Sequence, residues 1–299
     1  MRVDLILTSD WHLREDQPTC RTDDYQKAQA KKVKFMRVLQ EEFECPIIVA
    51  GDLLDTWHVS PYFEGWLIRN LPKRINVIQG QHDLKQHNLA LHRKTSLNVL
   101  ESAGVVKVLK PGRSYATGQS TTLYAYPYGT ALSGLPRNTR TDRRIAVCHT
   151  LAYYKKKPFP GAPSEGNAFN IMKKLKGFDL IVTGDNHQPF SLEHKGQLMV
   201  NCGSLMRMDA NQGNYKPRVY LWNAKTNKKK TVYLPIKENV VSREHIEEKE
   251  ERDERVEAFV KRLRKDCEIG FSFRKNLKEF FDKNKTANAV TSKVWEMLE

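Results

Sequence analysis

Five short motifs of acidic, histidine and amide residues each directly follow a short apolar run, and this repetition constrains the fold more than any other feature of the chain. The clearest case is the run from Ile47 to Ala50, which leads into Gly51-Asp52-Leu53-Leu54-Asp55. An apolar run of this length that ends at a glycine turn is typical of a buried strand. Loops that follow the strands of an α/β sheet gather at one edge of it. The sequence therefore predicts an α/β fold with its chemistry in loops at that edge.

The order of apolar patterns in the first third of the chain predicts alternating strands and helices. Val33, Met36 and Leu39 recur at helical spacing in a segment that opens at Asp23-Asp24 and ends before Pro46. The expected strands cover residues 3–8, 47–50, 75–79 and 105–109, and the expected helices cover residues 23–44, 61–67 and 89–103. This alternation predicts a layered α/β fold whose strands are at least partly parallel.

The pattern changes after residue 120. Short strands are expected from there to residue 235, with hairpins that turn at Lys195-Gly196 and through Ala224 to Lys230, so this half is predicted to be antiparallel. After Val241 the sequence becomes charged and helical, with helices expected over 243–265, 271–281 and 289–298. We therefore expect a main domain over residues 1–241 and a small helical module over 242–299, either a cap or a partner-binding element.

The charge of the chain is strongly positive and unevenly distributed. The net charge is +15, from 50 Lys and Arg against 35 Asp and Glu. Residues 242–299 contain 14 of the basic and 14 of the acidic residues, which leaves 36 basic and 21 acidic residues in the first 241. An excess of this size on one domain favours a polyanionic partner. No apolar run reaches the ~18 residues of a membrane helix, so no membrane association is expected.

The five motifs supply residues that commonly bind metal ions. Asp10 and His12 lie two positions apart in an extended segment, so both side chains point the same way and can bind one ion. Asp52 can bridge to a second ion through its other oxygen. The remaining candidate ligands follow later strands and are Gln81, His149, Asp185 and His187. The sequence therefore predicts two neighbouring metal sites.

Mixed nitrogen and oxygen ligands suit Mn²⁺, Fe²⁺ or Zn²⁺ better than Ca²⁺ or an all-protein Mg²⁺ cage. Two such ions about 3.5–4 Å apart clamp a phosphate and lower the pKa of water to near neutrality. The expected chemistry is therefore hydrolysis of a phosphate ester.

The motif set resembles that of the calcineurin-like metallophosphoesterases, whose pattern is Asp-x-His, Gly-Asp-x-x-Asp, Gly-Asn-His-Asp or Glu, then His, then Gly-His-x-His. The corresponding stretches here are Ser9 to His12, Gly51 to Asp55, Gly80 to Asp83, Cys148-His149 and Gly184 to His187. Thr8 to Leu13 and Gly203 to Arg207 resemble the SbcD nuclease branch, with phage-encoded relatives nearest. The resemblance covers roughly residues 1–235. It implies two sheets flanked by helices, with a dimetal site at the strand ends.

The resemblance also implies a role for each site residue. Asp10, His12, Asp52 and His187 would hold the first ion, and Asp52, Gln81, His149 and Asp185 the second. His82 would protonate the leaving oxygen, and Asp83 would orient His82. Asp55 is expected to support the turn and not to bind metal.

Two positions depart from the family pattern, because the family has Asn where this chain has Gln81 and His where it has Asp185. Both residues still offer oxygen, which shifts the expected ion toward Mn²⁺ or Mg²⁺ at the second site. The second site is therefore either adapted to a different ion or degenerate, with weakened metal binding, and the sequence leaves both possibilities open. Mn²⁺ is the first expectation for the pair as a whole.

Four basic residues are candidate contacts to nucleic-acid phosphates. Lys155, Lys156 and Lys157 follow His149 closely, and Arg207 follows the Gly-Ser-Leu turn. A solvated charge run is the alternative for the three lysines. Lys228 to Lys230 are expected at a hairpin tip, in contact with solvent only.

The leading hypothesis is a metal-dependent phosphodiesterase that hydrolyses DNA, of the SbcD kind. One alternative is a phosphatase or phosphodiesterase for a small molecule or a phosphoprotein. Another is a DNA-binding subunit with a weakened second metal site. The resemblance implies an SbcC-like ATPase partner, and a second copy of the chain is a further candidate partner. Five cysteines without close pairs, and an N-terminus that begins a strand at once, predict a cytoplasmic protein without a signal peptide.

Overall fold

The computed structural model describes residues 2–118, 120–135, 143–270 and 273–298. The chain divides into two compact units, Met1–Ser242 and Arg243–Glu299. The larger unit contains both sheets and all of the predicted site residues. No described helix is both long enough and apolar enough to cross a membrane.

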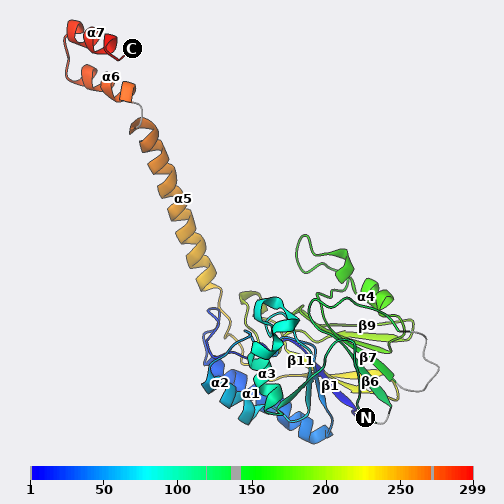
Figure 1. The fold of residues 1–299 in the computed structure, drawn as a ribbon. Coiled ribbons are helices and arrows are strands. Elements are labelled where there is room, and N and C mark those ends of the chain that lie inside the picture. Colours follow the sequence, from blue (N-terminus) through cyan, green and yellow to red (C-terminus); the bar gives the residue numbers. More distant parts are fainter. Residues whose placement is uncertain (1, 119, 136–142, 271–272, 299) are drawn as a thin grey trace. The chain divides into compact units, whose positions relative to one another are not determined.

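The first sheet has six strands in the order β12-β11-β1-β2-β3-β4 (Figure 1). They are β1 (Leu5–Thr8), β2 (Ile47–Val49), β3 (Ile75–Val77), β4 (Val106–Val108), β11 (Arg218–Asn223) and β12 (Lys228–Tyr233). β1 to β4 run parallel, whereas β11 and β12 run antiparallel to their neighbours. Parallel neighbours need crossover connections, and three helices supply them: α1 (Tyr25–Phe43), α2 (Pro61–Asn70) and α3 (Ser96–Ser102).

The second sheet also has six strands, in the order β5-β6-β7-β8-β10-β9. They are β5 (Ser114–Ala116), β6 (Thr121–Tyr126), β7 (Arg143–His149), β8 (Leu180–Gly184), β9 (Phe190–His194) and β10 (Gln197–Asn201). The antiparallel arrangement predicted for this half is wrong at its centre, because β6, β7, β8 and β10 run parallel. The edge strands β5 and β9 pair antiparallel with β6 and β10, respectively. Helix α4 (Ala168–Lys174) lies in the crossover between β7 and β8.

The two sheets pack face to face with helices on both outer sides, as the predicted α/β sandwich requires (Figure 1). Residues along β2 alternate between two cores because side chains of a strand point to opposite faces. Ile47 and Val49 belong to the core that includes residues of α1, α2 and α3. Ile48 and Ala50 belong to the core between the sheets, together with Val147 of the second sheet. A third core joins α4 to the outer face of the second sheet.

Local sequence sets most helix ends. The side chain of Asp24 accepts from the backbone N–H of Lys27 and caps α1, and Glu44 ends it in the left-handed conformation before Pro46. The helix expected over residues 89–103 is divided, because Thr95 caps α3 through the N–H of Asn98. A 3₁₀ turn, η2 (Leu89–Lys94), precedes that cap. The other 3₁₀ turns are η1 (Lys85–His87), η3 (Ser164–Gly166) and η4 (Ala210–Gln212).

The hairpin between β11 and β12 is shorter than expected. Lys228 to Lys230 lie within β12, where they pair with residues of β11. The ammonium of Lys229 lies 4.5 Å from the centre of the Tyr220 ring, which gives a cation–π contact. The expectation that all three lysines contact only solvent at a hairpin tip is therefore wrong.

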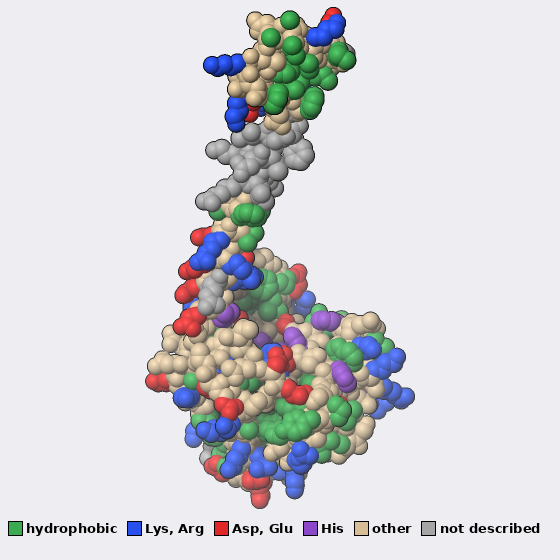
Figure 2. Space-filling model, turned by 90° about the vertical axis from the view of Figure 1, so that its left-hand side faces the viewer, with side chains coloured by type: hydrophobic (Ala, Val, Ile, Leu, Met, Phe, Trp, Pro, Cys, Tyr) green, Lys and Arg blue, Asp and Glu red, His purple; other side chains and the backbone are tan. Residues whose placement is uncertain are grey.

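The smaller unit consists of three helices, α5 (Glu244–Gly270), α6 (Phe273–Lys283) and α7 (Asn288–Glu296). Residues 271 and 272, where the second helix expected in this module was to begin, lie outside the described part. The ring of Phe281 is buried against Trp295, with 6.0 Å between the ring centres. Figure 2 shows further apolar side chains on the surface of this unit, and Phe273, Phe280 and Met297 are exposed.

Ile48→Ala should test whether the core between the sheets stabilises the fold. Ile48 is 0% exposed. Its truncation should lower the free energy of unfolding by about 2–5 kcal/mol, because it removes buried methyl groups and leaves a cavity. Urea unfolding followed by circular dichroism measures the change. Val38→Ala on α1 is the control, because Val38 is 50% exposed and its loss should cost about 0.5 kcal/mol or less. Equal effects of both substitutions would contradict the assignment of this core.

Candidate metal centre

The predicted ligands come together where strands of both sheets end. Asp10, Asp52 and Gln81 follow β1, β2 and β3 of the first sheet. His149 ends β7, and Asp185 and His187 follow β8 of the second sheet. Figure 2 shows His side chains (purple) close to Asp and Glu side chains (red) on one face of the larger unit. The face-to-face packing of the sheets thus places ligands from both halves of the chain at one site.

Asp52 contacts groups from both sheets. Its Oδ1 accepts a hydrogen bond of 2.9 Å from the backbone N–H of His82. Its buried Oδ2 lies 3.7 Å from Nε2 of His12 and 3.3 Å from Nε2 of His149, and accepts no hydrogen bond from the described residues. Burial raises the pKa of Asp52, but the imidazoles of His149, His12 and His82 outweigh burial and hold the pKa below its ordinary value. One oxygen is therefore fixed by the backbone, and the other faces two imidazole nitrogens.

Asp10, His12 and His187 form the first ligand group. Asp10 accepts from the N–H of Asp185 through Oδ1, whereas its buried Oδ2 has no hydrogen-bond partner among the described residues. His12 and His187 turn their Nε2 atoms toward each other at 3.1 Å. One ligand atom from each of the three lies within 4.8 Å of the other two. This spacing suits ligands of a single ion.

Asp10, Asp52 and His149 form a second group with the same spacing. Nδ1 of His149 lies 2.7 Å from the carbonyl oxygen of Ala50, which can only accept, so Nδ1 carries a proton. Its Nε2 lies 2.6 Å from Oε1 of Gln81 and faces Asp52. Fixing one imidazole nitrogen by a backbone carbonyl is the usual way to orient a metal-ligating histidine.

Histidine protonation at this second group depends on the carboxylates around it. Burial lowers the pKa of His149, but the adjacent carboxylate of Asp52 outweighs burial and raises the pKa to about 10. An imidazole must lose its second proton before it binds a metal ion. A cation bound at this position would take the place of that proton as the counter-charge of Asp52.

The backbone of the site lies in uncommon conformations. Asp10, His12, Asp52 and Asp185 all have positive φ values, of 50°, 44°, 49° and 82°. Positive φ values are uncommon in residues other than glycine. Residues that adopt them cluster at functional sites, where the surrounding structure compensates for the strain.

Two glycines make room for the ligands. A Cβ at Gly80 would lie 2.1 Å from Oδ1 of Asp52, and a Cβ at Gly51 would lie 2.0 Å from Nδ1 of His149. Both distances are too short for any side chain, so the close packing of strands and ligands requires glycine at both positions.

The role expected for Asp83 differs from its observed contacts. Its buried carboxylate accepts from the backbone N–H groups of Leu53, Leu54 and Gly80 at 3.0–3.3 Å. No hydrogen bond joins it to the ring of His82 within the described part of the chain. Burial and the charge of Asp52 raise the pKa of Asp83 to about 6. Asp83 therefore positions the loops after β2 and β3, because backbone amides already occupy its oxygens.

His82 is oriented by Asp55 instead. Nδ1 of the exposed His82 ring lies 2.8 Å from the backbone carbonyl oxygen of Asp55. This carbonyl fixes the proton on Nδ1, and Nε2 has no hydrogen-bond partner among the described residues. The rings of His82 and His12 meet edge to face, with 4.8 Å between their centres. His82 therefore lies at the solvent-facing side of the first ligand group.

Two supporting residues could not be identified from the motifs alone. The first is Arg14, which forms a 3.0 Å ion pair with the Asp55 carboxylate. That carboxylate also lies 3.3 Å from Nδ1 of His12. Nδ2 of Asn186 donates to the carbonyl of Ala152 at 2.7 Å and so connects the loops that follow β7 and β8. The position of Asn186 between two predicted ligands is the one sequence feature that could have indicated its role.

The basic candidates separate into two kinds. Lys155, Lys156 and Lys157 are all exposed, and the ammonium of Lys155 lies 5.3 Å from the centre of the Tyr154 ring. Arg207 is only 3% exposed, and its guanidinium donates to the carbonyls of Gly213 and Lys237. The lysines can therefore reach a polymer in solution, whereas Arg207 is held by the protein.

The donor set fits divalent metal ions. Oδ2 of Asp10 and Oδ2 of Asp52 are buried carboxylate oxygens without hydrogen-bond partners among the described residues. Nε2 of His12 and Nε2 of His187 also face each other, and this arrangement is favourable only if a proton or a cation lies between them. Such under-satisfied groups are unfavourable in a folded protein unless a cation binds them. The residues that would hold the ions are therefore Asp10, His12, Asp52, His149 and His187, with Gln81 and Asp185 beside them.

No family model and no curated protein matches this sequence. Among solved structures, the chain is similar to an archaeal phosphodiesterase at 12% identity and a TM-score of 0.41, with 77% of this chain and 99% of that chain covered. A phosphopantetheinyl hydrolase from Mycobacterium tuberculosis is similar at 16% identity and a TM-score of 0.44, with 78% and 96% covered. The sulfate thiohydrolase SoxB from Thermus thermophilus is similar at 11% identity and a TM-score of 0.43, with 77% of this chain and 56% of that chain covered. All three TM-scores lie below 0.5.

Asp52→Asn and His82→Ala should differ in metal content. Asp52→Asn should lose most of its bound divalent ions, because it removes the charge of the carboxylate that faces both ligand groups. His82→Ala should keep them, because the exposed His82 ring is hydrogen-bonded to a backbone carbonyl. Elemental analysis after dialysis against Mn²⁺ measures the content of each variant. Loss of metal from His82→Ala would make His82 a ligand and our assignment of it wrong.

Proposed function

We propose that this protein is a metal-dependent phosphodiesterase that hydrolyses DNA. The observation that carries the proposal is the pair of bare carboxylate oxygens on Asp10 and Asp52, each within reach of imidazole nitrogens. The resemblance of the five motifs to those of calcineurin-like metallophosphoesterases supports the same reaction. Bound there, two divalent ions would supply Lewis-acid activation of the phosphate ester and of water.

The protein's own residues have separate tasks in this proposal. The Asp52 carboxylate, held by the His82 N–H, keeps the two ligand groups at a fixed spacing. The Asp55 carboxylate orients His12, and its backbone carbonyl orients His82. With Nδ1 fixed, Nε2 of His82 is the atom that delivers a proton to the leaving oxygen of the ester. Because His82 is exposed, it can regain that proton from solvent after each turnover.

The charge distribution supports a nucleic-acid substrate. The first 241 residues hold 36 of the 50 basic and 21 of the 35 acidic residues. A phosphate polymer gains affinity from many such charges at once, because their binding releases counterions from the backbone. The exposed lysines at 155–157 follow the His149 strand in a loop that Asn186 anchors at Ala152. This anchor connects the lysine loop to the segment that contains Asp185 and His187.

A second candidate function is DNA binding with a weakened second metal site. Gln81 and Asp185, the two departures from the family pattern, bond to each other through Nε2 and Oδ1 at 2.8 Å. The Oε1 of Gln81 also lies 2.6 Å from Nε2 of His149. Gln81, Asp185 and His149 thus contact one another instead of a metal ion, which favours an empty second site.

DNA hydrolysis should require a divalent cation and should be fastest with Mn²⁺. The test incubates purified protein with labelled single-stranded and double-stranded DNA in Mn²⁺, in Mg²⁺ and in excess chelator. Cleavage that persists in chelator would contradict the mechanism. Cleavage of a small phosphoester with DNA untouched would favour a phosphatase, and DNA binding without any cleavage would favour the second candidate.

The His82→Ala variant supplies the control for a contaminating nuclease. A positioned general acid contributes roughly 10²–10⁴-fold to a rate, so the variant should lose turnover by that factor in Mn²⁺. A contaminant would leave the rate unchanged.

Replacing Lys155, Lys156 and Lys157 together with Ala should weaken DNA binding and its salt dependence. The slope of log affinity against log salt should fall by about 0.9 for each duplex phosphate contact that is lost. Fluorescence anisotropy at several salt concentrations measures both quantities. Lys173, Lys174 and Lys176, which are exposed on and after α4, give a control that removes the same charge. Equal slopes for the two triple variants would mean that residues 155–157 make no specific contact.

A further inference from the structure

A concave basic site lies beside α1 and is lined by none of the predicted metal ligands. It is a pocket of about 340 Å³ lined by α1, by Arg21, Asp23 and Asp24 just before it, and by the segments 206–207 and 235–237. Lys32 and Arg207 lie in its wall at 5% and 3% exposure, and the exposed Lys31 and Lys237 also line it. A volume above 300 Å³ is in the range of small-molecule sites.

The buried basic side chains of this pocket lack full counter-charge. Asp23 pairs with Arg21 at 2.7 Å, and Asp24 pairs with Lys27 at 2.8 Å. In the part of the chain that the structure describes, neither Lys32 nor Arg207 forms an ion pair with a carboxylate. The buried part of the pocket therefore contains more basic groups than acidic groups.

Backbone carbonyls are the partners of these two cations. Nζ of Lys32 donates to the carbonyl of Leu205 at 2.8 Å, and its other two N–H bonds have no hydrogen-bond partner among the described residues. Arg207 donates to the carbonyls of Gly213 and Lys237. Burial, together with the charges of Arg207 and Arg21, lowers the pKa of Lys32 to about 7. A carbonyl dipole compensates a buried charge only in part, so an anion in the pocket would be stabilising.

We propose that this pocket binds a phosphate group of a nucleotide or of a nucleic-acid strand. Lys32 and Arg207 supply the buried charge, and Lys31 and Lys237 supply charge at the opening. Hydrogen bonds between cationic groups and phosphate oxygens are among the strongest in proteins. The phosphate would occupy the free donor positions of Lys32 and complete its counter-charge. The proposal holds whether or not the metal centre cleaves DNA.

The pocket is connected to the metal centre through one residue. Leu205 accepts from Lys32 through its carbonyl and donates its N–H to the carbonyl of Asp10 at 2.9 Å. A phosphate bound at Lys32 would therefore lie one loop away from a predicted metal ligand.

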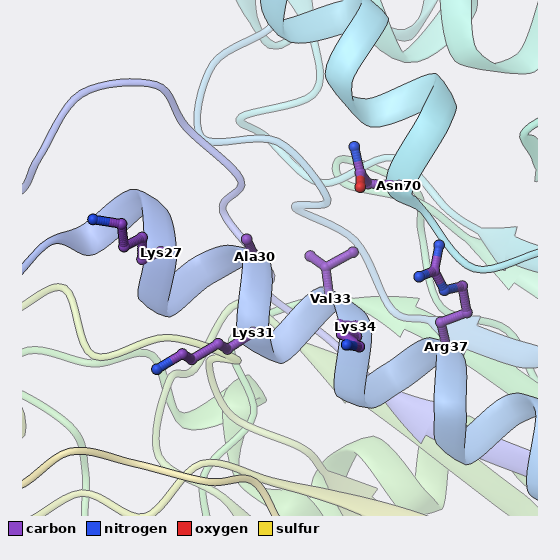
Figure 3. Close-up of a pocket in the computed structure, with 7 residues that line it drawn as sticks. All are labelled: Lys27, Ala30, Lys31, Val33, Lys34, Arg37 and Asn70. Atoms are coloured by element: carbon purple, nitrogen blue, oxygen red, sulfur yellow. The ribbon is translucent and has the colours of Figure 1, made fainter.

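A neighbouring hollow on the same helix provides the comparison. It measures about 330 Å³ and is lined by Lys27, Lys31, Lys34, Arg37 and Asn70 among others (Figure 3). Lys34 is exposed, and the buried residue of this hollow is the apolar Val33. Water can solvate these charges, so this hollow has no comparable need for an anion.

Calorimetric titration of the full chain with inorganic phosphate tests the proposal. Excess chelator removes metal ions that could bind phosphate themselves, and chloride keeps the ionic strength constant. The unmodified protein should bind one phosphate per chain, and Lys32→Met should bind at least about tenfold more weakly, because a charge-assisted hydrogen bond is lost. Lys34→Met removes the same charge from the same helix and should bind as the unmodified protein does.

Lys237→Ala keeps the test valid if Lys32→Met fails to fold. Because its side chain is exposed, its removal should leave the fold unchanged and weaken phosphate binding several-fold. Unchanged binding in Lys237→Ala and in a folded Lys32→Met protein would overturn the proposal, as would equal weakening in Lys34→Met.

Competition then distinguishes the two sources of the phosphate. Displacement of inorganic phosphate by a deoxynucleoside 5′-monophosphate alone would identify a free nucleotide as the ligand. Displacement by an oligonucleotide with a 5′-phosphate, but not by its unphosphorylated form, would identify a strand end. If none of these phosphate esters competes, the pocket is not a site for them and the proposal fails.

Discussion

The buried carboxylate of Asp52 is the interaction on which the rest of the site depends. A carboxylate in a protein interior is unfavourable unless charge and hydrogen bonds compensate for its lost hydration. Here the His82 N–H holds Oδ1, and imidazoles from both sheets face Oδ2. This arrangement keeps Asp52 ionised despite its burial, as a carboxylate that would hold a metal ion must be. The absence of a side chain at Gly80 is part of the same arrangement, because any Cβ there would occupy the space of Oδ1.

The sandwich makes this concentration of charge tolerable. Two apolar faces pack between the sheets, and the strands that supply ligands contribute residues to that core, such as Ile48 and Val147. The ligand loops begin where this packing ends, so their strained backbones are attached to rigid strands. Asp10, His12, Asp52 and Asp185 all adopt positive φ values there. The stability of the core between the sheets thus offsets local strain that a flexible loop would relieve by moving its ligands apart.

Basic residues in this protein occur in two physical settings with different consequences. Exposed lysines such as Lys155 are hydrated, so they attract a polyanion over a distance without a fixed geometry. Lys32 and Arg207 are buried, and carbonyls of neighbouring loops hold them in place. A buried cation selects for an anion of suitable size and position, because the pocket limits where its partner can lie. Leu205 joins this second setting to the backbone of Asp10.

The sequence by itself determined which candidate ligand residues are present, their positions after strands and the alternation of strands and helices in the first half, because motif spacing and apolar periodicity are local properties. It could not determine strand direction in the second half, since a short apolar run looks the same in a parallel and in an antiparallel sheet. Nor could it show that Asp83 accepts from backbone amides, that Asp55 contacts both His12 and His82, or that Arg207 is buried in the same pocket as Lys32. These contacts join residues on different loops, and only the packing of the two sheets decides which loops meet.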